Sequence, residues 1–132
     1  METNLLELPT EKECNGRLSA IGDAMYVIGG KWKLKIIVAL REGNKRFNEL
    51  QRSVTGISAR VLSNELKELE MNDLVKRNVF TQIPILVEYE VTEYSNTLDD
   101  VLQSLSEWGA IHRQRIMTGK RNTIQHETIN SL

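Results

Sequence analysis

The chain has 132 residues, of which 40% are apolar and 27% charged, and its formal net charge is −1. This length and composition are typical of one folded domain with a hydrophobic core. No run approaches the roughly 18 apolar residues that would span a bilayer, and the N-terminus lacks the apolar segment of a secretory signal. A single cysteine excludes an internal disulfide and favours the reducing cytoplasm as the location.

The small net charge conceals a segregation of charge along the chain. Residues 31–82 hold 11 Lys/Arg and 6 Asp/Glu, a net of +5, whereas residues 83–110 hold 6 Asp/Glu and no Lys or Arg. A phosphate backbone responds to local charge, since physiological salt screens interactions beyond about 8–10 Å. The basic block therefore favours a nucleic-acid partner despite the acidic total.

The first third of the chain predicts two helices after a polar lead-in. Residues 1–18 show no apolar periodicity, and we expect them to be flexible. Apolar residues at helical spacing predict a short amphipathic helix over residues 20–28, which the pair Gly29-Gly30 ends with a tight turn. A second helix is expected from Lys31, with Gly43 as its C-terminal stop.

Two further helices, over residues 46–53 and 58–71, are separated by a break at Thr55-Gly56. Ser58 can cap the second of them, and three leucines recur in it at helical spacing. Two short helices joined by a tight turn that contains glycine make a helix-turn-helix. Away from the leucine stripe, the first turns carry small, hydrogen-bonding and cationic side chains. Such side chains can contact the phosphates and base edges of a nucleic acid. An ordinary amphipathic surface helix is the alternative.

After these two helices, the spacing of apolar residues changes from that of a helix to the alternation of a β-strand. Residues 74–81 and 87–92 are rich in β-branched and aromatic side chains, and the second run alternates with a period of two. Pro84 between them excludes one continuous strand. The sequence thus predicts a β-hairpin over residues 75–92, which makes the helix pair a winged helix whose tip can touch DNA.

The last predicted helix, residues 98–117, carries a long apolar stripe. This stripe exceeds what a small winged domain needs for its own core, so we expect it to pack, with the 20–28 helix, against a second subunit. The alternative is that it folds back over its own domain. The expected dimer contacts are Ile21, Met25, Leu98, Val101, Leu102, Leu105, Trp108 and His112. Residues 118–132 are polar and unpatterned, and we expect a flexible tail.

The expected fold is therefore α+β and mainly α: a winged helix-turn-helix over residues 19–117 with an N-terminal and a long C-terminal dimerisation helix. In such a fold the second helix of the pair enters the major groove with its N-terminal part leading. Arg60 is the first candidate for a base or phosphate contact, because its planar fork fits guanine and phosphate alike. Lys33 and Arg52 have weaker claims. The predicted DNA contacts are Lys45, Arg46, Ser58, Arg60, Ser63, Asn64, Lys67, Arg77, Asn78 and Gln82.

No catalytic or metal-binding constellation can be assembled from this sequence. His112 and His126 lie far apart, and Cys14 has no histidine near it in the sequence. Two histidines and one cysteine do not supply the ligands of a metal site. The acids Asp99-Asp100 are explained by the dipole of the helix that they begin. We therefore expect neither an enzyme nor a cofactor or metal.

A series of short motifs runs through residues 20–117. They are Ile28-Gly-Gly-Lys-Trp32, Arg46-Phe-Asn-Glu-Leu50, Gly56-Ile-Ser58, Val61-Leu-Ser63, Leu66-Lys-Glu-Leu69, Asp73-Leu-Val-Lys-Arg77, Pro84, Val87-Glu-Tyr89, Thr92 and Trp108-Gly109. Together and in this order they resemble the HxlR family of bacterial transcriptional regulators. The resemblance implies a dimeric winged-helix protein that binds operator DNA and represses or activates transcription.

Two positions depart from the family's pattern. Members that sense oxidants or aldehydes carry a cysteine just before the first helix, where this chain has Ser19. Its one cysteine, Cys14, lies further upstream and is a candidate redox sensor or a bystander thiol. Ser95 stands where the family usually has glycine after the second strand. The competing function is a winged-helix module that binds proteins, against which the basic block over residues 31–82 favours DNA.

Overall fold

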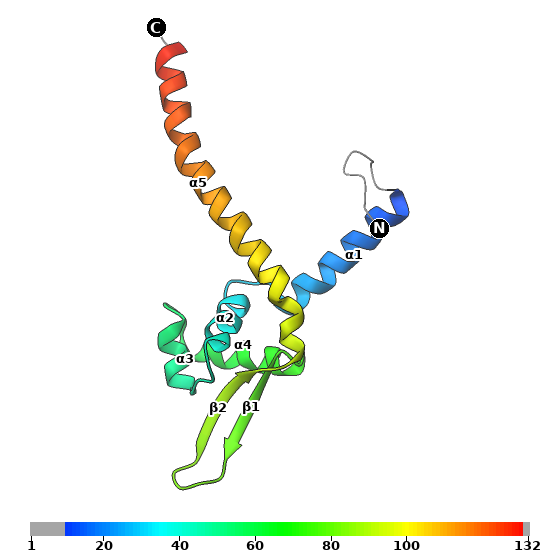
Figure 1. Ribbon diagram of the computed structural model, residues 1–132, viewed down its shortest axis with the longest axis vertical. Coiled ribbons are helices and arrows are strands. Elements are labelled where there is room, and N and C mark those ends of the chain that lie inside the picture. The colour runs from blue at the N-terminus through cyan, green and yellow to red at the C-terminus, as the bar shows by residue number, and fades with distance from the viewer. Residues whose placement is uncertain (1–9, 131–132) are drawn as a thin grey trace. The chain divides into compact units, whose positions relative to one another are not determined.

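The computed structural model describes residues 10–130, with side chains through residue 119. The elements follow in the order α1 (Glu11–Ile28), α2 (Lys33–Arg41), α3 (Phe47–Ser53), α4 (Ala59–Met71), β1 (Val75–Phe80), β2 (Leu86–Val91), the 3-10 helix η1 (Tyr94–Leu98) and α5 (Asp99–Asn130) (Figure 1). Contacts divide the chain into two compact units, one through Tyr94 and one from Ser95. The expected class, mainly helical with one small antiparallel sheet, is confirmed.

The core of the first unit is built from α2, α3, α4 and the start of β1. Helix α2 packs against α3, α4 and β2, and α4 packs against β1. Side chains three and four residues apart share a helix face, so each helix presents one apolar stripe to the others. The apolar residues of this core that are at most 2% exposed are Ile36, Ile37, Leu40, Leu50, Leu62, Leu66, Leu69, Leu74 and Val75.

Local sequence signals set both ends of α4. Ser58 precedes the helix in an extended conformation, and its Oγ accepts a hydrogen bond from the amide of Val61 at 3.2 Å. Asn72 caps the other end, and Asp73 turns the chain towards β1 with a positive φ of 59°. The predicted helix over residues 58–71 and its serine cap are confirmed.

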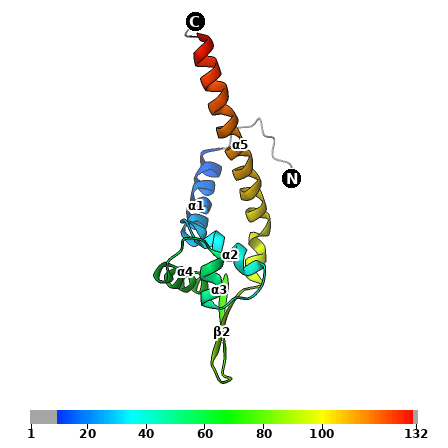
Figure 2. The same cartoon turned by 90° about the vertical axis from the view of Figure 1, so that its left-hand side faces the viewer.

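The hairpin of β1 and β2 is antiparallel, and its register runs from Val75 opposite Val91 to Phe80 opposite Leu86. Near its base, the backbone amide of Lys45 donates to the carbonyl of Tyr89 at 3.1 Å, and the amide of Tyr89 donates back at 2.8 Å. Beyond this anchor the hairpin projects away from the helices of its unit (Figure 2). The predicted wing is confirmed.

The first helix begins earlier than the sequence pattern predicts. A capping box starts α1 at Glu11, because the amide of Glu13 donates to Thr10 Oγ1 at 3.2 Å and the amide of Thr10 donates to Glu13 Oε2 at 3.1 Å. Residues 11–18, expected as part of a flexible lead-in, are therefore helical. Residues 1–9 of that lead-in lie outside the described residues.

The last helix ends later than predicted. It continues past the expected end at Met117 to Asn130, through most of the segment expected as a tail. The sequence offers no proline to end it, and Gly119, the one glycine after Met117 in the helix, does not break it, since a single glycine costs only about 1 kcal/mol in a helix. None of the helices in residues 10–130 is long and apolar enough to cross a membrane.

Candidate nucleic-acid interface

The outer face of α4 carries hydrogen-bonding and cationic side chains. Arg60, Asn64 and Lys67 are all exposed and recur at the spacing i, i+4, i+7. This spacing places them on one side of the helix, opposite its buried leucines. A guanidinium, a carboxamide and an ammonium in one row can contact base edges and phosphates together.

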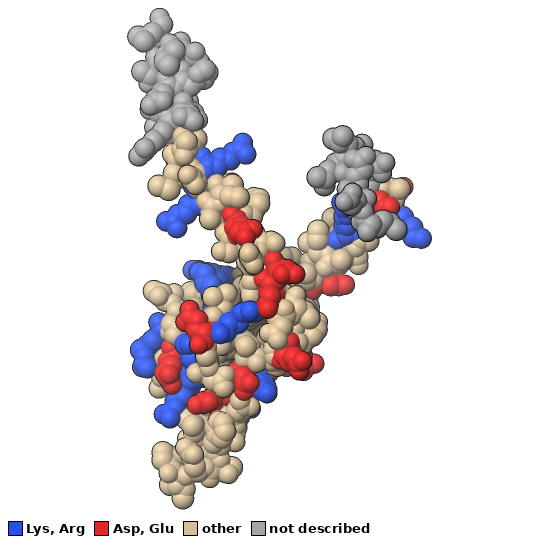
Figure 3. Space-filling view, in the orientation of Figure 1, with Lys and Arg blue, Asp and Glu red and all other residues tan. Residues whose placement is uncertain are grey.

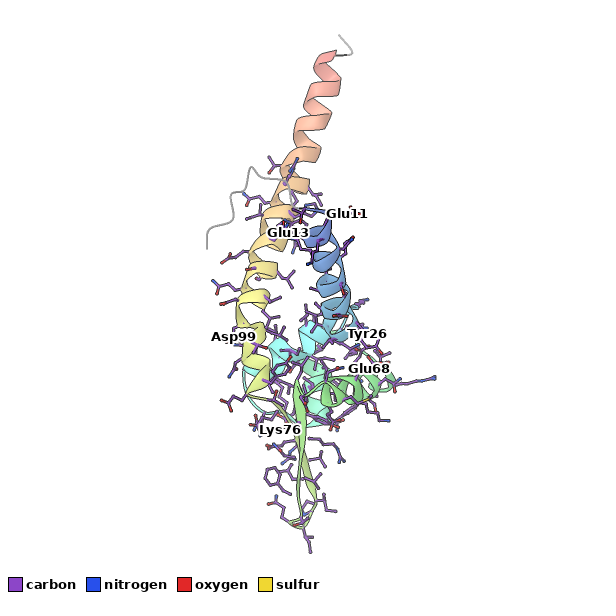
Figure 4. All side chains as sticks on the ribbon, turned by 90° about the vertical axis from the view of Figure 1, so that its right-hand side faces the viewer. Glu11, Glu13, Tyr26, Glu68, Lys76 and Asp99 are labelled. Atoms are coloured by element: carbon purple, nitrogen blue, oxygen red, sulfur yellow. The ribbon has the colours of Figure 1, made fainter. Side chains whose placement is uncertain are left out.

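Two of the three acidic side chains of α4, Glu65 and Glu68, are bound by Lys33 on one flank of the helix. This lysine of α2 is only 7% exposed, and its Nζ lies 2.7 Å from Glu65 Oε2 and 2.5 Å from Glu68 Oε2. Figure 4 marks Glu68 on α4. The weak claim of Lys33 as a DNA contact is therefore wrong, because its buried ammonium forms ion pairs with Glu65 and Glu68. Its charge offsets acids that would otherwise repel a phosphate backbone.

The charge state of Lys33 follows from its surroundings. Burial by itself lowers the pKa of this lysine, because it disfavours the charged form. The hydrogen bonds and negative charges of Glu65 and Glu68 outweigh burial, and the net pKa is raised above the ordinary value of 10.5. The ammonium is thus charged at neutral pH, and the bridge between α2 and α4 persists there.

The two cations before α3 differ in what they can contact. Lys45 is half-buried, and its Nζ donates to the carbonyl of Ala39 at 3.0 Å. It caps the C-terminal end of α2, which weakens its case as a phosphate anchor. Arg46 is exposed, and its Nε lies 3.9 Å from Glu49 Oε1 in an exposed pair. Such a pair contributes little, so Arg46 can exchange Glu49 for a phosphate.

The remaining predicted contacts lie on α4 and on the wing. Ser58 is exposed, but its Oγ is the helix cap, and Ser63 is half-buried. Arg77 and Gln82 are exposed. Asn78 Nδ2 donates to Glu90 Oε2 at 2.7 Å, so its amide serves the hairpin itself.

Two cations that sequence reasoning missed lie around Trp32. Lys31 Nζ lies 4.7 Å and Lys35 Nζ 5.4 Å from the centroid of the indole ring. The same ring borders the helix-turn-helix turn, since a Cβ added at Gly56 would lie 3.8 Å from it. Both lysines are exposed and stand beside the turn that leads into α4. The alternation of Lys31, Lys33 and Lys35 with apolar residues was the available signal.

Each unit also leaves apolar side chains exposed. On α1 these are Leu18, Ile21, Met25 and Tyr26, which are 57–86% exposed. On α5, Leu105 is 47% and Trp108 64% exposed, and the ring of Trp108 stacks on His112 with centroids 4.9 Å apart. Val101, Leu105 and Trp108 line a shallow apolar hollow on α5. Of the other predicted dimer contacts, Val101 is exposed, and Leu98 and Leu102 are half-buried.

Within the described residues, no group of three or more His, Cys, Asp or Glu side chains could hold a metal ion. Cys14 is exposed in the second turn of α1. The concentration of exposed cations around α4 and its turn is thus the main chemical feature of the first unit. Figure 3 shows Lys and Arg interspersed with Asp and Glu over the visible face of this unit.

The fold and this surface define a winged helix-turn-helix protein that binds DNA. The profile of the HxlR-like helix-turn-helix family matches residues 27–117. The chain is 38% identical over 106 residues to the HTH-type transcriptional regulator YtcD of Bacillus subtilis. The aligned residues cover 80% of this chain and 84% of YtcD.

Solved structures agree with this match. The crystal structure of YtcD superposes with a TM-score of 0.69 at 41% identity, over 72% of this chain and 97% of that one. The oxidized form of the redox regulator HypR gives a TM-score of 0.65 at 40% identity, over 69% and 94%. The chain belongs to the HxlR-like helix-turn-helix family and is a DNA-binding transcriptional regulator.

Proposed function

We propose that two copies of the chain bind operator DNA as a homodimer, with α4 of each copy in the major groove. The observation that carries this proposal is the row of Arg60, Asn64 and Lys67 on the outer face of α4. Lys33 offsets part of the negative charge of Glu65 and Glu68, which reduces the charge that opposes DNA on that flank of the row. Lys31, Lys35 and Arg46 serve as phosphate contacts around the row, and Arg77 serves on the wing.

The proposed dimer is supported by the exposed apolar side chains of α1 and α5. Large contiguous apolar patches on a protein surface mark association sites. A two-fold dimer presents two copies of α4 to successive turns of the major groove, about 10 bp apart. Its operator is then an inverted repeat with that spacing.

The test of the α4 proposal is Arg60→Ala. An operator is first recovered by sequencing the DNA that the wild-type protein pulls down. Loss of one base or phosphate contact from a guanidinium should weaken operator binding about 10- to 100-fold in fluorescence anisotropy at fixed salt. The matched control is Arg113→Ala, which removes an exposed arginine of α5. Equal affinity of Arg60→Ala and wild type would remove Arg60 from the interface.

A protein-interaction module is the second candidate function, and the strand face of β2 that carries Glu88 and Glu90 is the surface that such a module would use. It does not account for the cations around α4, so we place DNA first. We propose no catalytic activity and no cofactor, and we place the protein in the cytoplasm. Binding to DNA should weaken steeply with salt, because bound cations release counterions from the phosphates.

Cys14 is the one candidate for a redox signal in this proposal. The relative HypR is described as a redox regulator, and the thiol of Cys14 is exposed. An oxidant that acts through this thiol should change operator affinity in the wild type and leave Cys14→Ser unaffected. The same response in both proteins would make Cys14 a bystander.

A further inference from the structure

Lys33 joins α2 to α4 through two ion pairs. Its Nζ lies 2.7 Å from Glu65 Oε2 and 2.5 Å from Glu68 Oε2. Among the residues whose burial is described, Lys33 is the only buried one with a charged side chain. Replacing a buried ion pair by apolar side chains often leaves a protein as stable as before or more stable. Stability is therefore a weak reason for a charge at this position, and the geometry around it indicates a second role.

The two acids that Lys33 binds are direct neighbours of the row of Arg60, Asn64 and Lys67. Glu65 follows Asn64 in the sequence, and Glu68 follows Lys67. Successive residues of an α-helix are about 100° apart around its axis, so ion pairs that hold the two acids also fix the direction in which the row points. The buried leucines of α4 fix this direction less well, because apolar contacts are non-directional.

A small rotation of α4 about its axis is enough to break contacts with bases. The outer side chains of a helix lie about 5–6 Å from its axis, so a rotation of about 20° moves them by about 2 Å. Hydrogen bonds to base edges need donor–acceptor distances of about 2.7–3.2 Å. The attraction between a cation and a phosphate survives such a shift, because it falls only slowly with distance. Loss of the ion pairs of Lys33 should therefore remove base contacts and spare phosphate contacts.

The N-terminal end of α2, where Lys33 lies, also carries two of the proposed phosphate contacts. Lys31 Nζ and Lys35 Nζ lie 4.7 Å and 5.4 Å from the ring centroid of Trp32. The same ring borders the turn before α4, at Gly56. One end of one helix thus holds cations for the DNA backbone and, through Lys33, the rotation of the helix that reads bases. Phosphate contacts position a protein on DNA and base contacts specify the sequence, and Lys33 connects the two.

We infer that Lys33 is a positioning residue for sequence recognition, which sets the rotation of α4 and touches no DNA itself. This inference rests on the proposed binding of α4 in the major groove. It gives Lys33 an effect on the preference for the operator over other DNA. A lysine that only offset the charge of Glu65 and Glu68 would instead change the affinity for all sequences by the same factor.

The test measures the affinity of the full-length protein for a recovered operator and for random-sequence DNA of equal length, by fluorescence anisotropy at fixed salt. In Lys33→Met the ratio of the two affinities should fall about tenfold, as expected for the loss of one base contact. The matched control is Lys35→Met, which removes an exposed phosphate contact and should weaken both complexes alike. An unchanged ratio in a folded Lys33→Met protein overturns the positioning role.

A double-mutant cycle separates positioning from a purely structural role. The ion pairs of Lys33 do not include Arg60, so the effects of Lys33→Met and Arg60→Ala on operator binding should add if Lys33 acts on stability alone. If Lys33 sets the rotation of α4, Arg60→Ala should weaken binding about 10- to 100-fold in the wild type and less than about threefold in Lys33→Met. Additive effects overturn the inference.

A second variant covers the case in which Lys33→Met does not fold. Lys33→Met/Glu65→Met/Glu68→Met replaces the ion pairs by apolar contacts, which commonly preserves stability, and it also removes one net negative charge. Binding to random DNA should tighten, and the preference for the operator should fall about tenfold. An equal gain on both DNAs overturns the positioning role alone. A wild type without preference for the operator, or an Arg60→Ala variant that binds the operator as the wild type does, overturns the proposed function instead.

Discussion

Helices α4 and α5 both carry apolar stripes in the sequence, but the stripe of α4 is buried in the structure and the stripe of α5 is largely exposed. The leucines of α4 are at most 1% exposed, whereas Leu105 and Trp108 of α5 are 47% and 64% exposed. Helical periodicity predicts that a stripe exists and says nothing of what covers it. The partner of α4 lies within its own unit, while the stripe of α5 is open to another surface. This difference is the reason that we propose a second subunit.

The largest expected change in stability comes from truncating a buried leucine of α4. Leu66→Ala should lower the free energy of unfolding by about 3 kcal/mol, because it removes buried methyl groups and leaves a cavity. Urea denaturation followed by circular dichroism measures this loss. Leu105→Ala on α5 is the matched variant and should cost under about 1 kcal/mol, since half of that side chain is already exposed. Equal losses would contradict the contrast between the two helices.

The second effect concerns the polar contact that holds α4 in place. Lys33→Met should destabilise the protein by about 2 kcal/mol at pH 7, because it leaves the partly buried Glu65 without its cation. The matched control is Lys35→Met. Lys35 lies two residues further along α2, where it is exposed, and its loss should have little effect. A loss as small as that of the control would mean that the bridge contributes nothing measurable.

The pH dependence of the same bridge has a definite sign. The pKa of Lys33 is raised in the folded state above its ordinary value of 10.5. The stability that it contributes is therefore fully present below pH 10.5 and is lost as the pH rises through the raised value. The difference between wild type and Lys33→Met in urea melts should be constant from pH 7 to about pH 9.5 and should shrink above pH 10.5. A difference that shrinks between pH 7 and 9 would contradict this assignment.

The smallest expected effect lies at the start of α1. Thr10→Ala removes one half of the capping box and should cost about 1 kcal/mol of local helix stability. Hydrogen exchange of the amides in the first turn of α1 measures it, with faster exchange expected there. Exchange in α4 should not change, because α1 is exposed along most of its length and its cap is local.

The sequence predicts those parts of the fold that depend on neighbouring residues. Ser58, Asn72 and Asp73 mark the ends of α4 through local hydrogen bonds and dihedral angles, and the alternation in β2 marks the wing. Thr10 and Glu13 are an equally local signal for the start of α1, but the segment lacks the apolar stripe from which helices are predicted. The predicted end of α5 is too early for a similar reason, since polarity alone does not break a helix.

The candidate site was only partly predictable, because side-chain pairing across elements is not local. Lys33 looked like an exposed cation, yet Glu65 and Glu68 lie more than thirty positions away in the chain and bind it. Lys45 and Asn78 are likewise committed to Ala39 and Glu90. The row of Arg60, Asn64 and Lys67 was predictable because helical spacing alone sets it.

The most direct test of the account is a hydroxyl-radical footprint of the full-length protein on its recovered operator. A homodimer that reads DNA through α4 should protect two segments about 10 bp apart, related by an inverted repeat. Arg60→Ala should weaken protection of both segments equally. A single protected segment, or protection unrelated to any repeat, would contradict the proposed dimeric binding through α4.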